Sequence, residues 1–374
     1  MFKKFSEYHL KDYNFRLIIM LIAITVIGIL AVGSAQKSLQ SKQLIGFIIG
    51  FVIMIVLSFI DYTKLLKLWW LIYAGNLTLL ILVLAIGETH GGAQRWLNIG
   101  IAVQPSELAK ILLILFFAQF IMKFKDKMKD SRIILLAIGL ILVPLGLVVA
   151  QPDLSTTIVI FLVMSVVLFA GEVPYKYVLG ALGVAIPAAA LVFIYILQPS
   201  QKILKDYQQD RILAWLHPEE YEMEEAYQQL NSVMAIGSGQ LTGKGLNNNV
   251  VNSVKNANFI SKPQTDFIFT IIGEELGFVG SVAVILLLLG IAVECFIIAH
   301  KSKEISGRII GAGMGSLVAF QGMINIAVAT GLLPNTGLPL PFVSAGLTSL
   351  VSLYIGMGFV LNVGLQCEQK YIQY

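Results

Sequence analysis

Long apolar runs dominate this sequence and decide what it can fold into. A helix that crosses a bilayer needs about 17–25 residues, and ten such runs lie at 16–35, 44–60, 66–86, 105–123, 133–150, 154–171, 178–197, 267–299, 309–332 and 347–366. Each run is expected to be a helix, because lipid offers no partner to open backbone groups. Only 13% of the residues are charged, against roughly 25% in soluble domains. The sequence therefore predicts an all-α integral membrane protein with about ten transmembrane helices.

Lysine and arginine are unequally shared between the two sides of this predicted bundle. They gather in the connections of one side, for example at 123–132 and 301–308. The short connections of the other side hold only Lys37, Lys42 and Arg95. Because cytoplasmic loops carry the excess of basic residues, we expect both termini to lie in the cytoplasm.

This orientation places the one long polar segment, residues 198–266, outside the cytoplasm. The segment is short and rich in Gln, Asn and Gly, so residues 1–374 are interpreted as a single membrane domain. The patterns at 211–216 and 227–236 predict short amphipathic helices on the membrane surface. The run 267–299 is longer than one span needs, so part of it is expected at an interface or outside the membrane.

Composition also excludes several classes of function. No basic block with interleaved aromatic residues is present, so we expect no nucleic-acid partner. The four histidines form no metal-ligand pattern, and Cys295 and Cys367 lack the CxxC spacing of metal or redox sites. Both thiols are interpreted as inert.

Glu107 and Lys110 lie in the sequence QPSELAK at 104–110, at the start of an apolar run. At a spacing of three residues the two charges share one helix face. A lysine near the bilayer centre costs about 2.5–3.5 kcal/mol, so we expect this pair to have a structural or functional role. Two interpretations stay open, which are a structural ion pair between neighbouring helices and a polar site that faces substrate.

Two further positions have both a structural and a functional interpretation. Asp153 lies where two runs meet, which suits a helix N-cap. Lys244 lies in the glycine-rich run 237–245, which lacks the spacing of a nucleotide-binding P-loop. The run is either a flexible turn or a stretch of backbone that meets a pyrophosphate.

Asp266 is the sharpest candidate for a catalytic residue. It ends the polar segment and abuts the apolar sequence Phe267-Ile268-Phe269. A carboxylate against a partly dry aromatic wall can have a raised pKa and act as a general base. A helix N-terminus opposes this shift, so a role as helix cap is the alternative on sequence alone.

The segment 333–346 links the last two runs and contains three prolines. These residues forbid a regular helix. Irregular backbone at membrane depth is tolerated only where it is buried in protein or lines a cavity. The segment is therefore predicted to be re-entrant or to line a cavity.

Five ordered motifs together resemble the SEDS (RodA/FtsW-type) family. They are GAQRWL and QPSELAK at 92–110, QPDL at 151–154, IGSGQLTGKG at 236–245 preceded by Gln228 and Ser232, TDFIF with EELG at 265–277, and GLPLPF at 337–342 followed by Ser344. After Phe342 many members read SYGGSS, where this chain has SAGLTS at 344–349. We interpret the chain as RodA-like rather than FtsW-like.

The resemblance implies a peptidoglycan glycosyltransferase that acts on lipid II at the outer face of the bacterial cytoplasmic membrane. Undecaprenyl pyrophosphate is the expected leaving group, and Asp266 is the expected general base for the acceptor hydroxyl. The residues expected to bind substrate are Arg95, Glu107, Lys110, Asp153, Arg211, Gln228, Ser232, Lys244 and Ser344.

The family also implies further components. A positive element is needed at the pyrophosphate, which is either a divalent cation (Mg²⁺ or Mn²⁺), with Asp266 as a possible ligand, or one of Arg95, Arg211 and Lys244. A class B penicillin-binding protein is the expected partner for cross-linking, in cell elongation more than in division. The nascent glycan strand and membrane lipids are the other expected partners.

Two other functions remain open from the sequence. The Glu107–Lys110 pair within a span suits a lipid II flippase, although no matched pair of interrupted helices, typical of transporters, is present. A purely scaffolding role predicts that substitutions of Asp266 and Lys110 spare cell-wall synthesis.

Overall fold

The computed structural model is a bundle of long helices that coincide with the predicted runs. It describes residues 13–90, 93–98, 100, 102–198, 201, 206–221, 226–247, 260 and 263–369. The long helices are α1 (Phe15–Ala35), α2 (Lys37–Ser58), α4 (Trp69–Ile86), α5 (Pro105–Phe124), α6 (Ser131–Ala150), α7 (Leu154–Ala170), α8 (Tyr175–Ile196), α11 (Ile268–Lys301), α12 (Ile305–Ala329) and α13 (Leu347–Gln369). Seven of them are long and apolar enough to span a membrane by length and composition, and α7 is a shorter apolar helix. The all-α membrane fold is confirmed.

Short elements connect these helices. The helix α3 (Tyr62–Leu66) and a 3₁₀ turn (Lys125–Lys127) lie in two of the connections, and α9 (Asp206–Leu216) and α10 (Tyr227–Ser238) lie in the long polar segment. The two amphipathic helices expected in that segment are therefore present. Residues 199–200, 202–205, 222–225, 248–259 and 261–262 of the segment lie outside the described part of the chain.

A small sheet between α4 and α5 was not expected from the sequence. It comprises β1 (Glu88–His90), β2 (Ala93–Asn98) and β3 (Ala102–Val103), paired antiparallel in the order β1-β2-β3. The three strands have two to six residues each, which is too short a pattern for a strand prediction. It carries Arg95 on its central strand.

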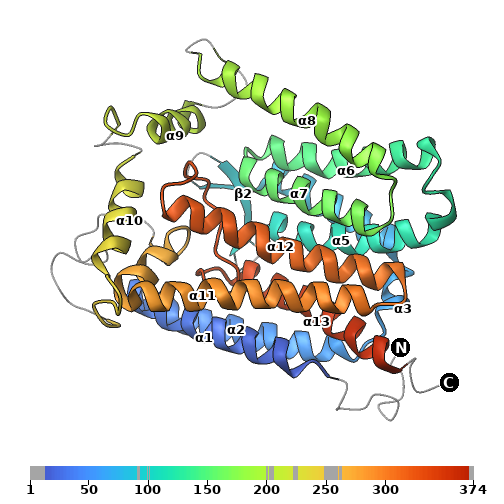
Figure 1. Cartoon of the computed structure of the whole chain (residues 1–374), viewed down its shortest axis with the longest axis horizontal. Coiled ribbons are helices and arrows are strands. Elements are labelled where there is room, and N and C mark those ends of the chain that lie inside the picture. The colour runs from blue at the N-terminus through green and yellow to red at the C-terminus, as the bar shows by residue number, and fades with distance from the viewer. Residues whose placement is uncertain are drawn as a thin grey trace.

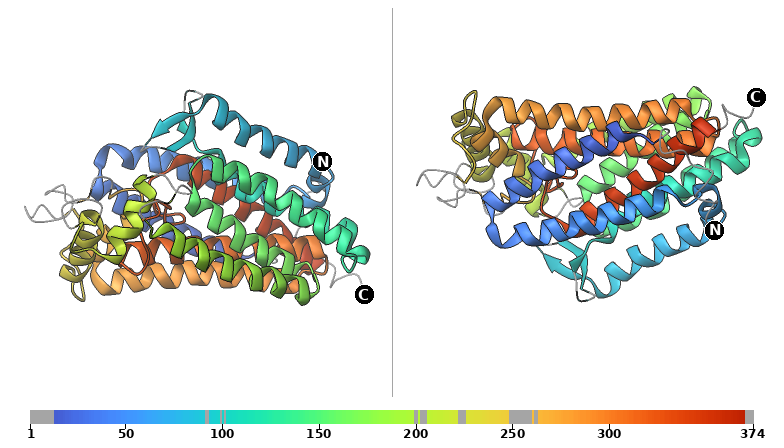
Figure 2. Two further views of the ribbon diagram at one scale, coloured as in Figure 1. Left: turned by 90° about the horizontal axis from the view of Figure 1, so that it is seen from above. Right: turned by 90° about the horizontal axis from the view of Figure 1, so that it is seen from below.

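The bundle has a central layer and a lipid-facing periphery. In α12 and α13, 78% of the most apolar window is buried, whereas α2, α4 and α6 bury only 28%. Figure 2 shows the long helices running along the molecule with the sheet projecting beside them. Helices with a mostly exposed apolar surface are those that face lipid, so α12 and α13 form the core.

The long helix α11 is interrupted at Gly277. This residue has φ 66° and ψ −160°, which is not helical. The interruption divides α11 into a short first part and a span of ordinary length, in accord with the overlong run 267–299. Its geometry favours glycine, since left-handed backbone is strained for other residues.

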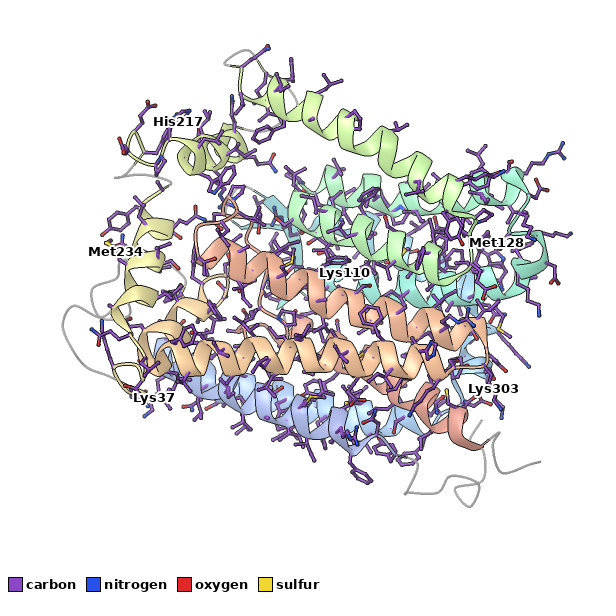
Figure 3. The ribbon with its side chains drawn as sticks, viewed as in Figure 1. Lys37, Lys110, Met128, His217, Met234 and Lys303 are labelled. Atoms are coloured by element: carbon purple, nitrogen blue, oxygen red, sulfur yellow. The ribbon has the colours of Figure 1, made fainter. Side chains whose placement is uncertain are left out.

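The two ends of the bundle carry different elements. Figure 1 shows α9 and α10 at one end, and the N- and C-terminal ends of the chain at the other. Figure 3 places Lys37 and Met234 at the first end and Lys303 at the second, with Lys110 between them. We call the first the polar-segment end and the second the terminal end. The described part of the long polar segment thus lies at the opposite end of the bundle from the start of α1 and the end of α13.

Candidate functional site

Asp266 lies at the polar-segment end, in a turn directly before α11. The N-cap residue of α11 is Phe267, so Asp266 stands one residue outside the helix instead of capping it. Phe267 and Phe269 are each only 2% exposed, whereas Asp266 is half-buried. Asp266 therefore lies where the buried start of α11 meets the more accessible end of the polar segment.

The non-helical segment 333–346 holds the backbone around Asp266. The amide of Asn325 on α12 donates to the carbonyl oxygens of Asp266 at 2.8 Å and of Leu338 at 2.6 Å. Ser344 donates its hydroxyl to the carbonyl of Thr265 at 2.6 Å and accepts from the amide of Leu340 at 2.7 Å. Residues 340–344 of the segment are buried and residues 333–337 are half-buried. Ser344 holds the segment through hydrogen bonds to backbone atoms.

Gly337 brings this segment against the carboxylate itself. Its φ is +73°, and a Cβ built on it would lie 3.5 Å from Oδ2 of Asp266. The preceding carbonyl, that of Thr336, accepts a hydrogen bond from the hydroxyl of Ser155 on α7. Since Ser155 follows Asp153 by two residues, the segment connects the surroundings of Asp266 with those of Asp153.

Asp153 and Arg95 form a partly buried ion pair beside this segment. The Nη1 of Arg95 lies 3.6 Å from Oδ1 of Asp153, and the two side chains are 19% and 2% exposed. Arg95 also donates to the carbonyl of Pro152. Oδ1 of Asp153 accepts from the amide of Thr156 at 3.2 Å. Asp153 is therefore the N-cap of α7 and, at the same time, the partner of a cation.

Several polar atoms near this ion pair are buried without a hydrogen-bond partner among the described residues. They are Nε of Arg95, Oδ2 of Asp153, Oδ1 of Asn335 and Oγ1 of Thr336. Buried polar groups are normally hydrogen-bonded, and these four atoms are the donors and acceptors here that the described protein groups do not engage. We call Arg95, Asp153, Asn335 and Thr336 the polar corner.

Helix α9 reaches the polar corner from outside. Gln208 donates to the carbonyl of Pro152 at 3.4 Å, the same acceptor that Arg95 uses. Trp215 donates to the carbonyl of Gly331 at 3.0 Å. Arg211 lies on α9 one turn after Gln208, which brings this predicted residue to the same side of the molecule.

Glu107 and Lys110 are buried inside the bundle. Their side chains are 2% and 1% exposed, and Nζ of Lys110 lies 2.7 Å from Oε1 of Glu107 and 2.7 Å from Oε1 of Gln321. The hydroxyl of Ser349 donates to Oε2 of Glu107 at 2.7 Å. Gln321 in turn donates to the carbonyl of Pro339 at 3.0 Å. This geometry favours the structural ion pair, which joins α5, α12, α13 and the segment 333–346.

Helix α10 is fastened to α11 and α12. The hydroxyl of Ser232 contacts that of Thr270 and donates to the carbonyl of Ala329 at 2.7 Å. Gln229 donates to the carbonyls of Val328 at 2.8 Å and Leu333 at 2.6 Å. Gln228 is half-buried on the same helix. Ser232, which was predicted to bind substrate, therefore fastens α10 to α11 and α12.

The glycine-rich run packs on the interruption of α11. The amides of Lys244 and Gly245 donate to the carbonyls of Glu274 and Glu275 at 3.0 and 2.9 Å. Nζ of Lys244 lies 2.9 Å from Oε1 of Glu274, and the lysine side chain is 28% exposed. The amides of residues 244 and 245 are therefore used within the protein, which disfavours a pyrophosphate cradle at these two positions.

Sequence reasoning missed the side-chain amides that hold the site together. Gln321 and Asn325 lie four residues apart on α12, so they share one face, and Gln43 on α2 donates to the carbonyl of Ser344 at 3.0 Å. Amide side chains inside a membrane helix commonly bond across helices. Their spacing in an apolar run was the signal that could have found them.

A ready-made metal centre is not visible in the described part of the chain, where no three His, Cys, Asp or Glu side chains gather. The fold and the arrangement of these residues define a multi-pass membrane protein with a group of polar residues at one end of its bundle. Residues 12–369 match the family FTSW_RODA_SPOVE, described as "Cell cycle protein". The chain belongs to this family, which is the SEDS family of the sequence resemblance.

Curated relatives and solved structures agree with this assignment. Proteins named "Probable peptidoglycan glycosyltransferase FtsW" are 33% identical in Escherichia coli O6:H1, over 80% of this chain and 70% of the relative, and 32% identical in Geobacter metallireducens, over 98% of each. A solved structure described as "Structural coordination of polymerization and crosslinking by a peptidoglycan synthase complex" matches with TM-score 0.78 and 28% identity, over 95% of this chain and 98% of that one. The rod shape determining protein RodA of Thermus thermophilus matches with TM-score 0.69 and 28% identity, over 94% and 96%. Both subfamily names occur among the matches, so the RodA-like assignment stays a prediction.

Proposed function

We propose that this chain is a peptidoglycan glycosyltransferase that polymerises glycan strands from lipid II. The observation that carries the proposal is the position of Asp266, whose half-buried carboxylate contacts Gly337 in the segment that also borders the polar corner. The named relatives are peptidoglycan glycosyltransferases. A general base close to a cation and further polar groups is what a sugar transfer at a pyrophosphate requires.

The proposed chemistry uses Asp266 on the acceptor sugar and Arg95 on the leaving pyrophosphate. Asp266 accepts the proton of the acceptor sugar hydroxyl, whose oxygen forms a new bond to the anomeric carbon of the donor. The bond from that carbon to the pyrophosphate oxygen breaks, and its electron pair leaves with undecaprenyl pyrophosphate. The guanidinium of Arg95, which is partly exposed at the polar corner, stabilises the growing negative charge.

A divalent cation is part of this proposal. Mg²⁺ is commonly held by one or two carboxylates together with substrate phosphates instead of by an all-protein cage. The carboxylates at this end that would hold such a cation are Asp266, which is half-buried, and Asp153, which is paired with Arg95. When bound, the cation would neutralise charge on the leaving pyrophosphate.

The proposal includes an orientation and a partner. The bundle is placed in the bacterial cytoplasmic membrane with both termini in the cytoplasm, which puts Asp266 on the outer face where lipid II carries its sugars. This orientation is supported by the basic residues of the terminal end. A class B penicillin-binding protein is the proposed partner, since one similar structure is described as a complex for polymerization and crosslinking.

Transport of lipid II was motivated by the Glu107–Lys110 pair inside a span. The structure gives both charges protein partners and leaves them 2% and 1% exposed. The pair is therefore accounted for without a transported substrate, and no observation favours transport over polymerisation.

The proposal is tested with purified protein and fluorescent lipid II. We expect a ladder of glycan strands on a gel, which disappears when the divalent cation is chelated and returns when Mg²⁺ or Mn²⁺ is added. A parallel assay measures transbilayer movement of labelled lipid II in vesicles. Movement without any glycan ladder would support the flippase and refute the polymerase.

A further inference from the structure

A cavity at the terminal end of the bundle has no part in the proposed reaction. Its volume is about 410 Å³, and it opens between the first turn of α1 and the last turns of α11 and α13. The residues that decide its chemistry are Asn14, Phe15, Arg16, Glu294, Ile297 and Lys301. We call it the terminal-end cavity.

Two cations stand at this cavity. Arg16 and Lys301 are both exposed. Among the residues that the structure describes, neither of them forms an ion pair. Their charges are therefore available to an anionic ligand that enters between α1 and α11.

The inner wall of the cavity is fixed by Asn14. Its Oδ1 accepts from the amide of Leu17 at 3.1 Å and so caps α1, while its Nδ2 donates to Oε2 of Glu294 at 3.0 Å. Glu294 is half-buried. One carboxylate therefore lies in the wall between the two cations, and the three charged side chains sum to a net charge of +1.

The rim of the cavity is apolar and continues onto the lipid-facing surface. Phe15 is 53% exposed and Ile297 is 39% exposed, and Ile19 on the next turn of α1 is 64% exposed. A soluble anion would gain no binding free energy from an apolar rim. A phospholipid would gain it, because its acyl chains lie along apolar helices while its phosphate lies at the level of Arg and Lys side chains near the helix ends.

We propose that the terminal-end cavity binds the phosphate head group of an anionic phospholipid from the membrane leaflet on that side. Arg16 and Lys301 bind the phosphate, Phe15 and Ile297 contact the acyl chains, and the negative charge of Glu294 weakens the binding of any anion in the cavity. The inference is independent of the proposed glycosyl transfer. It rests on the membrane orientation only for naming the leaflet, which is the cytoplasmic one.

The test measures lipid binding to the purified full chain in detergent, by native mass spectrometry with cardiolipin, phosphatidylglycerol and phosphatidylcholine as probes. Each basic side chain near the surface contributes roughly fivefold to the affinity for anionic lipid, so Arg16→Ala with Lys301→Ala is expected to weaken cardiolipin binding about 30-fold. The matched control is Lys37→Ala with Lys42→Ala, which removes two exposed cations at the opposite end. It should leave this high-affinity site unchanged.

The variant Glu294→Gln tests whether the cavity binds an anion or whether its charged residues serve only the packing of the helices. Glutamine keeps an oxygen that can accept from Asn14 but removes the negative charge, so cardiolipin should bind several-fold more tightly. A loss of binding in this variant would contradict the proposal, as would equal binding of phosphatidylcholine, which would define an apolar crevice only. Competition by inorganic phosphate at the concentration of the lipid phosphate would point to a free-anion site and also overturn it.

Discussion

Asn325 holds the backbone of Asp266 from the neighbouring helix. Its side-chain amide bridges the carbonyl oxygens of Asp266 and Leu338, at 2.8 and 2.6 Å. One side chain thus fixes the carboxylate-bearing turn and the segment 333–346 relative to each other. The position of the base depends on α12 and not only on the turn that carries it.

Replacement of Asn325 by Asp is therefore expected to slow polymerisation at least tenfold. The variant loses both donors, and each buried carbonyl left unsatisfied costs about 1–3 kcal/mol. Asn362→Asp is the matched control, because Asn362 donates to the carbonyl of Ser58 at 2.6 Å in a different part of the bundle. Thermal unfolding in detergent should shift similarly in both variants, while only Asn325→Asp loses rate per folded molecule. Equal rate losses in both would contradict a positioning role.

Gly337 supplies a second test of how the segment positions Asp266. A left-handed conformation costs a residue with a side chain about 1–2 kcal/mol, so Gly337→Ala should move the backbone beside the carboxylate and reduce the rate. Gly346→Ala in the same segment is the control, since a Cβ there would lie 3.7 Å from Cβ of Ser349, an ordinary contact. Glycan ladders from the two variants are compared at equal protein concentration. Normal activity of Gly337→Ala would show that this contact is dispensable.

The buried Glu107–Lys110 pair makes a prediction about stability. Lys110→Met leaves the carboxylate of Glu107 buried without its cation, which should destabilise the protein by about 3–5 kcal/mol. The double variant with Glu107→Gln should recover much of this loss, because no uncompensated charge remains. Lys125→Met, at an exposed position after α5, should be neutral. Unfolding is followed by circular dichroism in one detergent, and a double variant as unstable as Lys110→Met would argue against an ion pair that acts as a unit.

Gly277 should tolerate no side chain. A Cβ there would collide with the backbone nitrogen of Gly243 and lie 2.8 Å from the carbonyl oxygen of Leu241. Gly277→Ala is therefore expected to displace the glycine-rich run and lower the yield of folded protein. Gly139→Ala on α6, where a Cβ meets nothing within 4 Å, is the control. The two variants are compared by size-exclusion chromatography. Matching monodisperse peaks would mean that the close packing of Gly277 against the glycine-rich run is not required for folding.

Much of the fold was readable from the sequence because lipid imposes a simple rule. Backbone groups in a bilayer must be paired within a helix, so apolar runs of sufficient length predict helices whatever their tertiary partners. The interruption of α11 was foreseen only as excess length in the run 267–299. Its position at Gly277 depends on the packing of the glycine-rich run, which no local pattern records.

The site was only partly readable. Asp266 stood out because a carboxylate directly before an apolar aromatic run is uncommon, and the structure places it half-buried beside Gly337. The linking residues Ser155, Gln321 and Asn325 were missed, since their roles arise from backbone carbonyls that reach them across the fold. Lys244 was expected near substrate, and its ion pair with Glu274 was invisible because thirty residues separate the two.

The most direct measurement of the central claim compares initial rates of lipid II polymerisation by the wild type, Asp266→Asn and Asp266→Glu. Asparagine keeps the size of the side chain but cannot take up a proton, so the rate should fall about 10²–10⁴-fold, the usual contribution of a general base. Glutamate keeps the carboxylate and should retain more activity than asparagine. Wild-type rates in Asp266→Asn, with the fold verified by thermal unfolding, would contradict the assignment of Asp266 as the base.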